Sequence, residues 1–239
     1  MKRACWLAAV AVLAIPGSRA VGAMLDVKAG EKERWSFVMA GRPVGSMSAE
    51  CRAVRKTAAG AEADSTYNLK LNLPAQGSEI RLSMKGAFTL SRTGTPVGLS
   101  IDADAAGQRQ NVKVRFASGK ATLTGTVGGQ AIRKSAAVTG KEFLSVNNLM
   151  TLLSLATRVL RPAPGNSVTA PFFAIEMMQS VDLTFAARSK TETLRVGGRN
   201  LECVVCDVAP IAAKIHVVRA TGEMVRYAMD AQQLVIERQ

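Results

Sequence analysis

Apolar and polar residues alternate along most of this chain. Every second residue is apolar in TYNLKLNL, residues 66–73, and in SEIRLSMKGAFTL, residues 78–90. Shorter runs with the same period occur at residues 97–102, 111–116 and 181–185. Successive strand residues point to opposite faces of a sheet, so this period predicts strands with one buried and one solvated face.

Short turn signals separate these runs. The Gly-Gly pairs at 128–129 and 197–198 favour two-residue turns in which both central residues take a positive φ. Turn signals that contain glycine occur at residues 92–96, 105–108, 117–120, 127–130, 196–199 and 220–223. Links this short join antiparallel neighbours, so the sequence predicts a meander of about twelve strands.

One segment has a helical period instead. In SVNNLMTLLSLATRVLRPAPG, apolar residues recur three and four positions apart, which predicts a helix over 147–160. Ser145 or Asn147 is the expected N-cap, and Pro162 and Pro164 close the far end. The apolar face of this helix must be covered, and the partner available is the apolar face of the sheet.

A long, twisted sheet with one apolar face cannot stay open in water. The sequence therefore predicts a mainly β fold: a large curved antiparallel meander, a half-barrel or incomplete barrel, packed on one central α-helix. We expect a single β-rich domain over 31–239, with a first meander over 31–140, the helix over 147–160 and a second meander over 167–239.

The first twenty residues, MKRACWLAAVAVLAIPGSRA, have the pattern of a secretory signal peptide. A positively charged start precedes an apolar core, and Pro-Gly breaks that core before small residues. Cleavage is expected after Ala20 or Ala23, which predicts a periplasmic or secreted protein. An uncleaved membrane anchor is the alternative, but the apolar run is shorter than the ~20 residues that a span needs.

The chain is strongly basic, which limits its partners. The formal net charge is +13, and it falls to +10 when Lys2, Arg3 and Arg19 leave with the signal peptide. This charge is compatible with an anionic membrane surface or an envelope protein as partner, although a solvated basic surface is the simpler explanation. The basic residues are scattered without interleaved aromatics, so nucleic acid is not expected. The oligomeric state stays open.

An outer-membrane barrel also shows alternating strands after a signal peptide. Such barrels carry girdles of Trp and Tyr at both membrane interfaces. Only one Trp and two Tyr follow residue 20 in this sequence. The sequence therefore argues against a membrane barrel.

Cysteines supply the first candidate for chemistry. Cys203 and Cys206 form a C-x-x-C motif, which fits a thiol redox couple or, with Cys51 and His216, a zinc site. Their neighbours are strand formers, and residues three apart in a strand lie ~10 Å apart and face opposite ways. Alternation places Cys51 and Cys203 inward, which makes them the candidate disulfide and leaves Cys206 as the remaining thiol. Free buried thiols are the open alternative.

Motifs of enzymes are missing from the sequence. It contains no phosphate-binding glycine loop, no H-E-x-x-H and no G-x-S-x-G. We therefore expect a non-enzymatic protein without a cofactor or a metal.

One-faced strands around a helix can leave an apolar concavity for a ligand. The residues expected to line it are Leu71, Leu82, Met84, Leu99, Val114, Leu153 and Phe185. Flexible methionines suit adaptable apolar pockets as well as ordinary cores. Those in or near apolar segments are Met84, Met150, Met177, Met178, Met224 and Met229.

The leading hypothesis is an exported binding protein for a lipid, an acyl chain or a lipidated partner. An envelope scaffold or protein-interaction module without a small ligand is the first alternative. A thiol-redox protein that uses Cys203 and Cys206 is the second.

The first strand pair resembles that of a known group of domains. The segment ERWSFVMAGRPVGSM, residues 33–47, contains a G-x-x-V-G hairpin formed by Gly41, Val44 and Gly45. It is similar to the opening of exported, uncharacterised β-rich bacterial domains, some of which precede transglutaminase-like domains. The ending TGEMVRYAMDAQQLVIERQ, residues 221–239, resembles their closing strand pair. A helix between two meanders also resembles the half-barrel of periplasmic lipoprotein carriers. No catalytic domain follows, so the resemblance implies no enzymatic activity.

Overall fold

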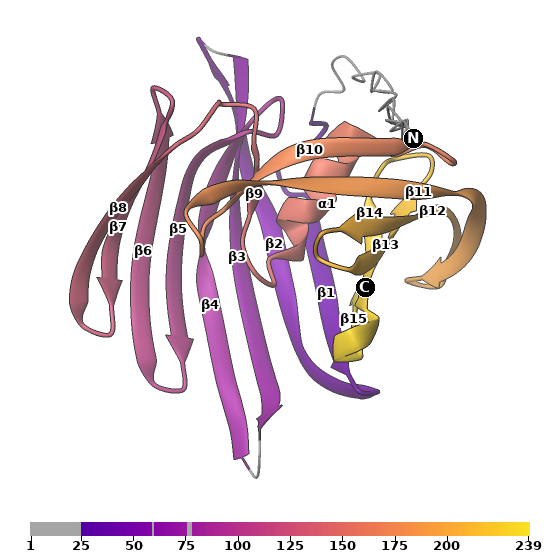
Figure 1. Ribbon diagram of the computed structural model, residues 1–239, viewed down its shortest axis with the longest axis horizontal. Coiled ribbons are helices and arrows are strands. Elements are labelled where there is room, and N and C mark those ends of the chain that lie inside the picture. The colour runs from indigo at the N-terminus through magenta and orange to yellow at the C-terminus, as the bar shows by residue number, and fades with distance from the viewer. Residues whose placement is uncertain (1–24, 59, 76–77) are drawn as a thin grey trace, which may run out of the picture.

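The computed structural model of the chain describes residues 25–58, 60–75 and 78–239 (Figure 1). These residues form fifteen β-strands, one α-helix and one short 3-10 helix. None of their helices has the length and apolarity that a membrane span requires. The predicted signal peptide, residues 1–20 with cleavage after Ala20 or Ala23, lies outside the described residues.

The first strands are β1 (Lys32–Met39), β2 (Arg42–Thr57), β3 (Gly60–Ala75), β4 (Ser78–Ser91), β5 (Pro96–Ala105), β6 (Gln108–Ala117), β7 (Lys120–Val127) and β8 (Gln130–Ala137). The elements after them are β9 (Phe143–Ser145), α1 (Met150–Leu160), β10 (Ser167–Ala174), β11 (Gln179–Val196), β12 (Arg199–Ala209), β13 (Ala213–Val218), β14 (Met224–Met229), η1 (Asp230–Gln232) and β15 (Leu234–Arg238).

All of the described strands belong to one sheet, in the order β8-β7-β6-β5-β4-β3-β2-β1-β15-β14-β13-β12-β11-β10-β9. Neighbouring strands are antiparallel except β9 and β10, which pair in parallel. The sheet curls around α1 without closing on itself (Figure 1). The predicted mainly β, curved antiparallel meander around one helix is therefore confirmed. The strands outnumber the expected twelve because some, such as β13, are buried on both faces and show no alternation.

The predicted turns lie between neighbouring strands. Gly128 and Gly129 link β7 to β8 with φ values of 57° and 81°, and Gly197 and Gly198 link β11 to β12 with 56° and 79°. The expected two-residue turns with two positive φ angles are thus confirmed at both Gly-Gly pairs. Such turns match the right-handed twist of the strands that they connect.

Glycines let neighbouring strands of the sheet approach closely at two places. A Cβ atom on Gly86 of β4 would stand 1.9 Å from the carbonyl oxygen of Ser100 in β5. The Tyr67 hydroxyl from β3 reaches the same place and donates a hydrogen bond of 3.1 Å to that oxygen. On β7, a Cβ on Gly125 would stand 1.9 Å from the Asn111 carbonyl oxygen of β6. Glycine at such points introduces the curvature that a half-barrel needs.

The main hydrophobic core fills the space between the inner face of the sheet and α1. Its largest fully buried side chains are Trp35, Phe37, Phe88, Phe172, Phe173 and Phe185. Phe173 of β10 meets Phe116 of β6 edge to face, with 5.5 Å between the ring centroids. Strands far apart in the sheet therefore contact each other across the interior.

The helix begins later than the sequence predicts. Leu149 is the N-cap residue of α1 and makes no side-chain capping hydrogen bond. Ser145 belongs to β9 instead, and the backbone N–H of Asn147 donates to the Glu176 carboxylate at 2.7 Å. The predicted cap at Ser145 or Asn147 is therefore wrong, because pairing of β9 with β10 holds this stretch in the sheet. The helix ends as expected, with Arg161 in the left-handed conformation just before Pro162.

Candidate functional site

An apolar cleft of about 530 Å³ opens beside the first half of α1. One wall is α1 with the β9–α1 connection, a second is the β10–β11 hairpin, and the third is formed by β14 and β15. Representative lining residues are Met150, Leu153, Phe172, Leu183, Tyr227 and Ile236. Pockets for small ligands have volumes of about 300–1,000 Å³ and mostly apolar walls, so this cleft has the size and character of a binding site.

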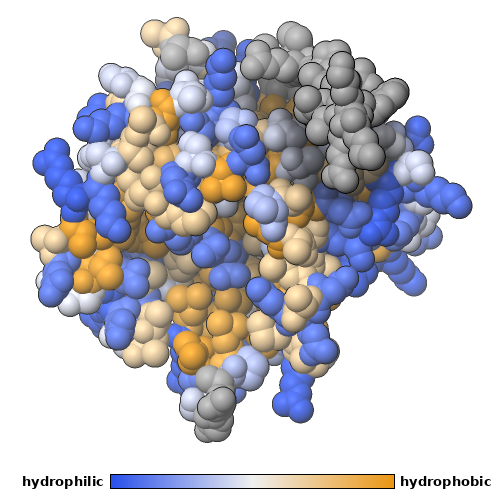
Figure 2. All heavy atoms as spheres, in the orientation of Figure 1, coloured by the Kyte–Doolittle hydropathy of each residue, from blue (hydrophilic) through white to orange (hydrophobic). Residues whose placement is uncertain are grey.

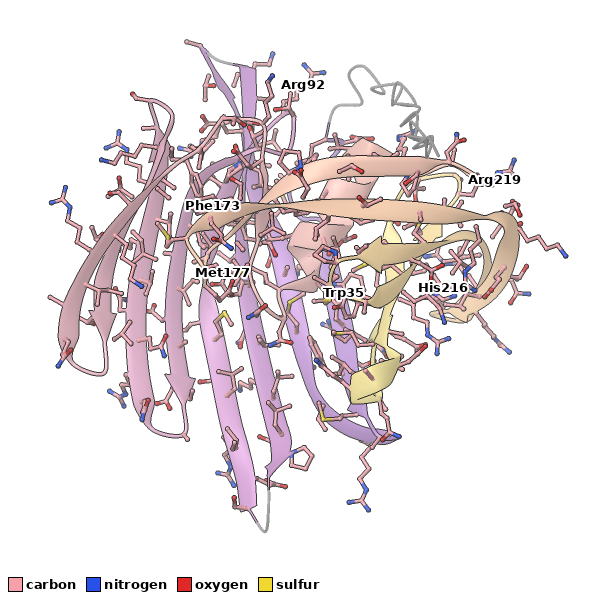
Figure 3. All side chains as sticks on the ribbon, viewed as in Figure 1. Trp35, Arg92, Phe173, Met177, His216 and Arg219 are labelled. Carbon is pink, nitrogen blue, oxygen red and sulfur yellow. The ribbon has the colours of Figure 1, made fainter. Side chains whose placement is uncertain are left out.

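Four lining residues are exposed and mark the mouth of the cleft: Asn147, Glu176, Met177 and Gln232. The other lining residues are buried or partly buried. Met177, in the turn between β10 and β11, has 55 % of its surface exposed although it is apolar (Figure 3). An apolar side chain held at the entrance of an apolar cleft can contact a ligand as it enters.

Strand pairing positions the walls of the cleft. Phe172 of β10 lies opposite Val181 of β11, and Tyr227 of β14 lies opposite Ile236 of β15. Residues directly opposite in a sheet share one face, so each pair presents its side chains to the same side. The two hairpins thus face α1 with apolar pairs.

Of the seven residues that the sequence predicts to line a cavity, the structure places one at the cleft and six elsewhere. Leu153 lines the cleft. The other six lie on inner-facing positions of β3, β4, β5, β6 and β11, and pack in or against the main core: Leu71, Leu82, Met84, Leu99, Val114 and Phe185. Alternation identifies the inner face of a strand but does not distinguish the wall of a cavity from a filled core. In that core, Phe173 of β10 packs against Phe116, and Phe172 of β10 packs against Phe185.

Most of the cleft residues were missed from the sequence, although one signal pointed to them. Met150, Met177 and Met229 line the cleft, and all three belong to the methionines noted in apolar segments. Phe172 was missed because β10 is buried on both faces near its end and shows no two-residue period.

A network of buried charges holds the other end of α1. The Arg158 Nη2 atom lies 2.6 Å from Glu31, 3.1 Å from Glu33 and 2.9 Å from Glu223, measured to carboxylate oxygens. Arg238 of β15 lies 3.0 Å from Glu223 and 3.8 Å from Glu33. Five charged side chains therefore meet at one place on the inner face. They come from α1, β1, β15, the segment before β1 and the link between β13 and β14.

The centre of the network is shielded from water. Arg158 and Glu33 are 7 % and 5 % exposed. Glu33 also accepts hydrogen bonds from the Ser154 hydroxyl and the Trp35 indole N–H, each at 3.4 Å. Burial alone would raise the pKa of the Glu31 carboxyl, but the hydrogen bond and charge of Arg158 hold that pKa below its usual value. The arrangement satisfies charges that would be costly to bury alone, and it ties α1 to β1.

The cysteines do not form the predicted pairs. Cys51 on β2 and Cys203 on β12 are separated by β1, β15, β14 and β13 in the sheet, and the thiols of Cys51, Cys203 and Cys206 are free. Cys206 faces the main core, whereas Cys203 packs in a second cluster with Val218 and Val225. The candidate Cys51–Cys203 disulfide is therefore not formed, because the sheet order keeps the two strands apart.

The thiols are also in surroundings that suppress redox chemistry. Burial raises the pKa of Cys203 to about 11 and that of Cys206 to about 12, so both stay protonated at neutral pH. Only the thiolate attacks a disulfide, and a reactive C-x-x-C motif lowers the pKa of one cysteine. Cys203 and Cys206 therefore lack the properties of a redox couple.

We expect the native thiols to react at least about a hundredfold more slowly with a disulfide reagent than those of the unfolded protein. The protein without residues 1–20 should show three free thiols in denaturant, from Cys51, Cys203 and Cys206. A Ser135→Cys variant on the exposed strand β8 supplies a fast-reacting reference thiol. Rapid reaction of the native wild type, or fewer than three thiols in denaturant, would contradict this prediction.

The single histidine is placed as a strand residue. His216 of β13 is buried, and its Nε2 atom lies 3.3 Å from the Glu192 carboxylate. Burial lowers the pKa of His216. Among the residues that the structure describes, no three His, Cys, Asp or Glu side chains are grouped so that they could hold a metal ion.

Comparisons with known proteins identify the fold. No protein-family model and no curated protein matches this chain. The chain is similar to the structure of a β-barrel-like protein of the domain of unknown function DUF1849 from Brucella abortus, with a TM-score of 0.51, 8 % identity and coverage of 87 % of this chain and 94 % of that chain.

Two further structures align less well. A DUF1089 family protein from Pseudomonas aeruginosa has a TM-score of 0.45 and 12 % identity, over 74 % of this chain and 87 % of its own. A protein with a YmcC-like fold from Bacteroides fragilis has a TM-score of 0.33 and 8 % identity, over 90 % of this chain and 96 % of its own.

The similarity to the Brucella protein defines the class of fold as barrel-like. Its description states a domain of unknown function and names no activity or ligand. This agrees with the coarser part of the predicted resemblance, to β-rich bacterial domains of unknown function. The resemblance through the G-x-x-V-G hairpin and to lipoprotein carriers stays a prediction.

Proposed function

We propose that this chain is an exported, non-enzymatic binding protein that holds the apolar part of a lipid, acyl chain or lipidated partner in the cleft beside α1. The observation that carries the proposal is the cleft itself, with a volume of about 530 Å³, walls formed mainly by apolar side chains, and the exposed Met177 at its mouth. Water can form few hydrogen bonds with such walls, so an apolar ligand is favoured there.

Exposed apolar surface at the ends of β3 and β4 also favours an apolar ligand or partner. Figure 2 shows apolar atoms gathered at the surface near the ends of β3 and β4. Ile80 of β4 is 43 % exposed there, and the neighbouring inner-facing residues Leu73 and Leu82 are only partly buried. Contiguous exposed apolar surface often marks an interaction site for a ligand, a membrane or a protein.

The test is binding of phenylnaphthylamine, an uncharged dye whose fluorescence rises in an apolar site. We expect the wild type to bind the dye and a lauroyl lipid to displace it. A Leu153→Lys variant should bind the dye at least about tenfold more weakly, because each tenfold corresponds to about 1.4 kcal/mol and a charge in the cleft is poorly solvated.

A Val54→Lys variant is the matched control, since Val54 is 45 % exposed and does not line the cleft. It should bind the dye as the wild type does. Absence of dye binding by a folded wild type, or equal weakening by both variants, would overturn the proposal. A folded wild type that does not bind the dye is the result expected for the alternative, an interaction module without a small ligand.

A further inference from the structure

The mouth of the cleft carries a negative charge without a balancing positive one. Among the described residues that line the cleft, Glu176 is the only charged side chain. It is exposed, as are the lining residues Asn147, Met177 and Gln232. The Asn147 backbone N–H bonds to it at 2.7 Å, and Met177 follows it in the chain. The polar end of a ligand whose chain lies in the cleft would therefore meet one carboxylate and two amides.

The position of Glu176 also weakens an attraction for anions that the helix would otherwise offer. The first turn of α1 lines the cleft, and the positive end of a helix dipole favours negative groups. The first turn contains no acidic residue and α1 has no side-chain cap. The Glu176 carboxylate accepts a hydrogen bond of 2.7 Å from the Asn147 N–H, two residues before the N-cap. The chain thus supplies its own anion at this place.

We propose that the cleft selects acyl chains whose polar end is uncharged, such as glycerol esters or amides, and discriminates against carboxylate and phosphate ends. This inference rests on the proposed function, because it assigns the class of ligand for the same cleft. Two carboxylates near each other repel, whereas an amide or hydroxyl can bond to Asn147, Gln232 and Glu176. The net positive charge of the chain attracts anions at long range, so the discrimination must arise at the mouth.

The test compares laurate with monolaurin, which have the same acyl chain, as competitors of phenylnaphthylamine at neutral pH. Wild-type protein should prefer monolaurin, and the Glu176→Gln variant should narrow this preference about tenfold, chiefly by binding laurate more tightly. The preference is the ratio of the two dissociation constants, that of laurate over that of monolaurin. Comparing this ratio between the wild type and a variant cancels the difference in apolarity between the two lipids. The Glu79→Gln variant, which removes an exposed carboxylate of β4 outside the cleft lining, is the control and should leave the preference unchanged.

The outcomes separate this inference from the proposed function. If Glu176→Gln leaves the preference as in the wild type, or if Glu79→Gln changes it equally, the selectivity inference is wrong while the apolar cleft stands. If the dye does not bind, or if it binds and neither lipid displaces it, the proposed function fails and this inference fails with it.

Discussion

Replacing Arg158 with methionine is expected to lower the free energy of unfolding by about 3–5 kcal/mol. The substitution keeps an unbranched side chain in the helix but removes the guanidinium that Glu31, Glu33 and Glu223 share. Glu33, which is 5 % exposed, would lose its closest positive partner and keep only Arg238 at 3.8 Å. Removal of one partner from a buried ion pair is costly because the remaining charge stays buried.

Urea unfolding followed by tryptophan fluorescence measures this loss. Without residues 1–20, Trp35 is the single tryptophan, and it is fully buried and hydrogen-bonded to Glu33. The control is Arg55→Met, which breaks a surface pair with Asp64 and should cost about 0–1 kcal/mol. Adding Glu33→Gln to the Arg158→Met variant should restore part of the stability. Equal losses in Arg158→Met and Arg55→Met would show that the network does not hold the helix.

The same network predicts the pH dependence of stability on the acid side. The folded state lowers the pKa of Glu31, so the unfolded state binds more protons in acid. The stabilisation is complete above the pKa of the unfolded chain and is lost as the pH falls through the lower pKa of the folded state. Arg158→Met removes the main cause of that lowering, so its stability should fall less steeply with acid than that of the wild type.

The strands and turns of this fold could be predicted because their signals are local. Alternation in residues 66–73 and 78–90 reports one buried face, and Gly128-Gly129 reports a turn that only positive φ angles allow. The pairing of β1 with β15, which joins the two halves of the sheet, connects residues about two hundred positions apart in the chain. Local pattern carries no information on such a pairing beyond the resemblance of the two ends to known strand pairs.

The position of the cleft and the charge network needed the tertiary structure. Leu153 and Val114 both lie in apolar patterns, but only the curl of the sheet puts Leu153 beside a cleft and Val114 in a filled core. Arg158 had a visible signal, a charge inside an apolar helical stretch with Ser154 one turn earlier. The helix was expected to bury one face, whereas the curled sheet also buries the side with Ser154 and Arg158.

Replacing Gly86 with alanine is expected to destabilise the fold by about 3 kcal/mol, at the upper end of what overpacking usually costs. The new Cβ would stand 1.9 Å from the Ser100 carbonyl oxygen and 2.8 Å from the Tyr67 hydroxyl oxygen. The first of these atoms belongs to the backbone of β5, which is paired to β4 and β6 and cannot move without disrupting both pairings. The measurement is again urea unfolding of the protein without residues 1–20.

Gly98→Ala on the neighbouring strand β5 separates this steric effect from the general effect of replacing glycine in a strand. The nearest atom to a Cβ on Gly98 is the Val114 carbonyl oxygen at 3.7 Å, an ordinary contact. Alanine should therefore stabilise the strand at Gly98 by about 0.5–1 kcal/mol. If Gly86→Ala were as stable as Gly98→Ala, β4 and β5 would not approach closely at Gly86. The curl that brings the inner face of these strands around the core would then need another origin than this glycine.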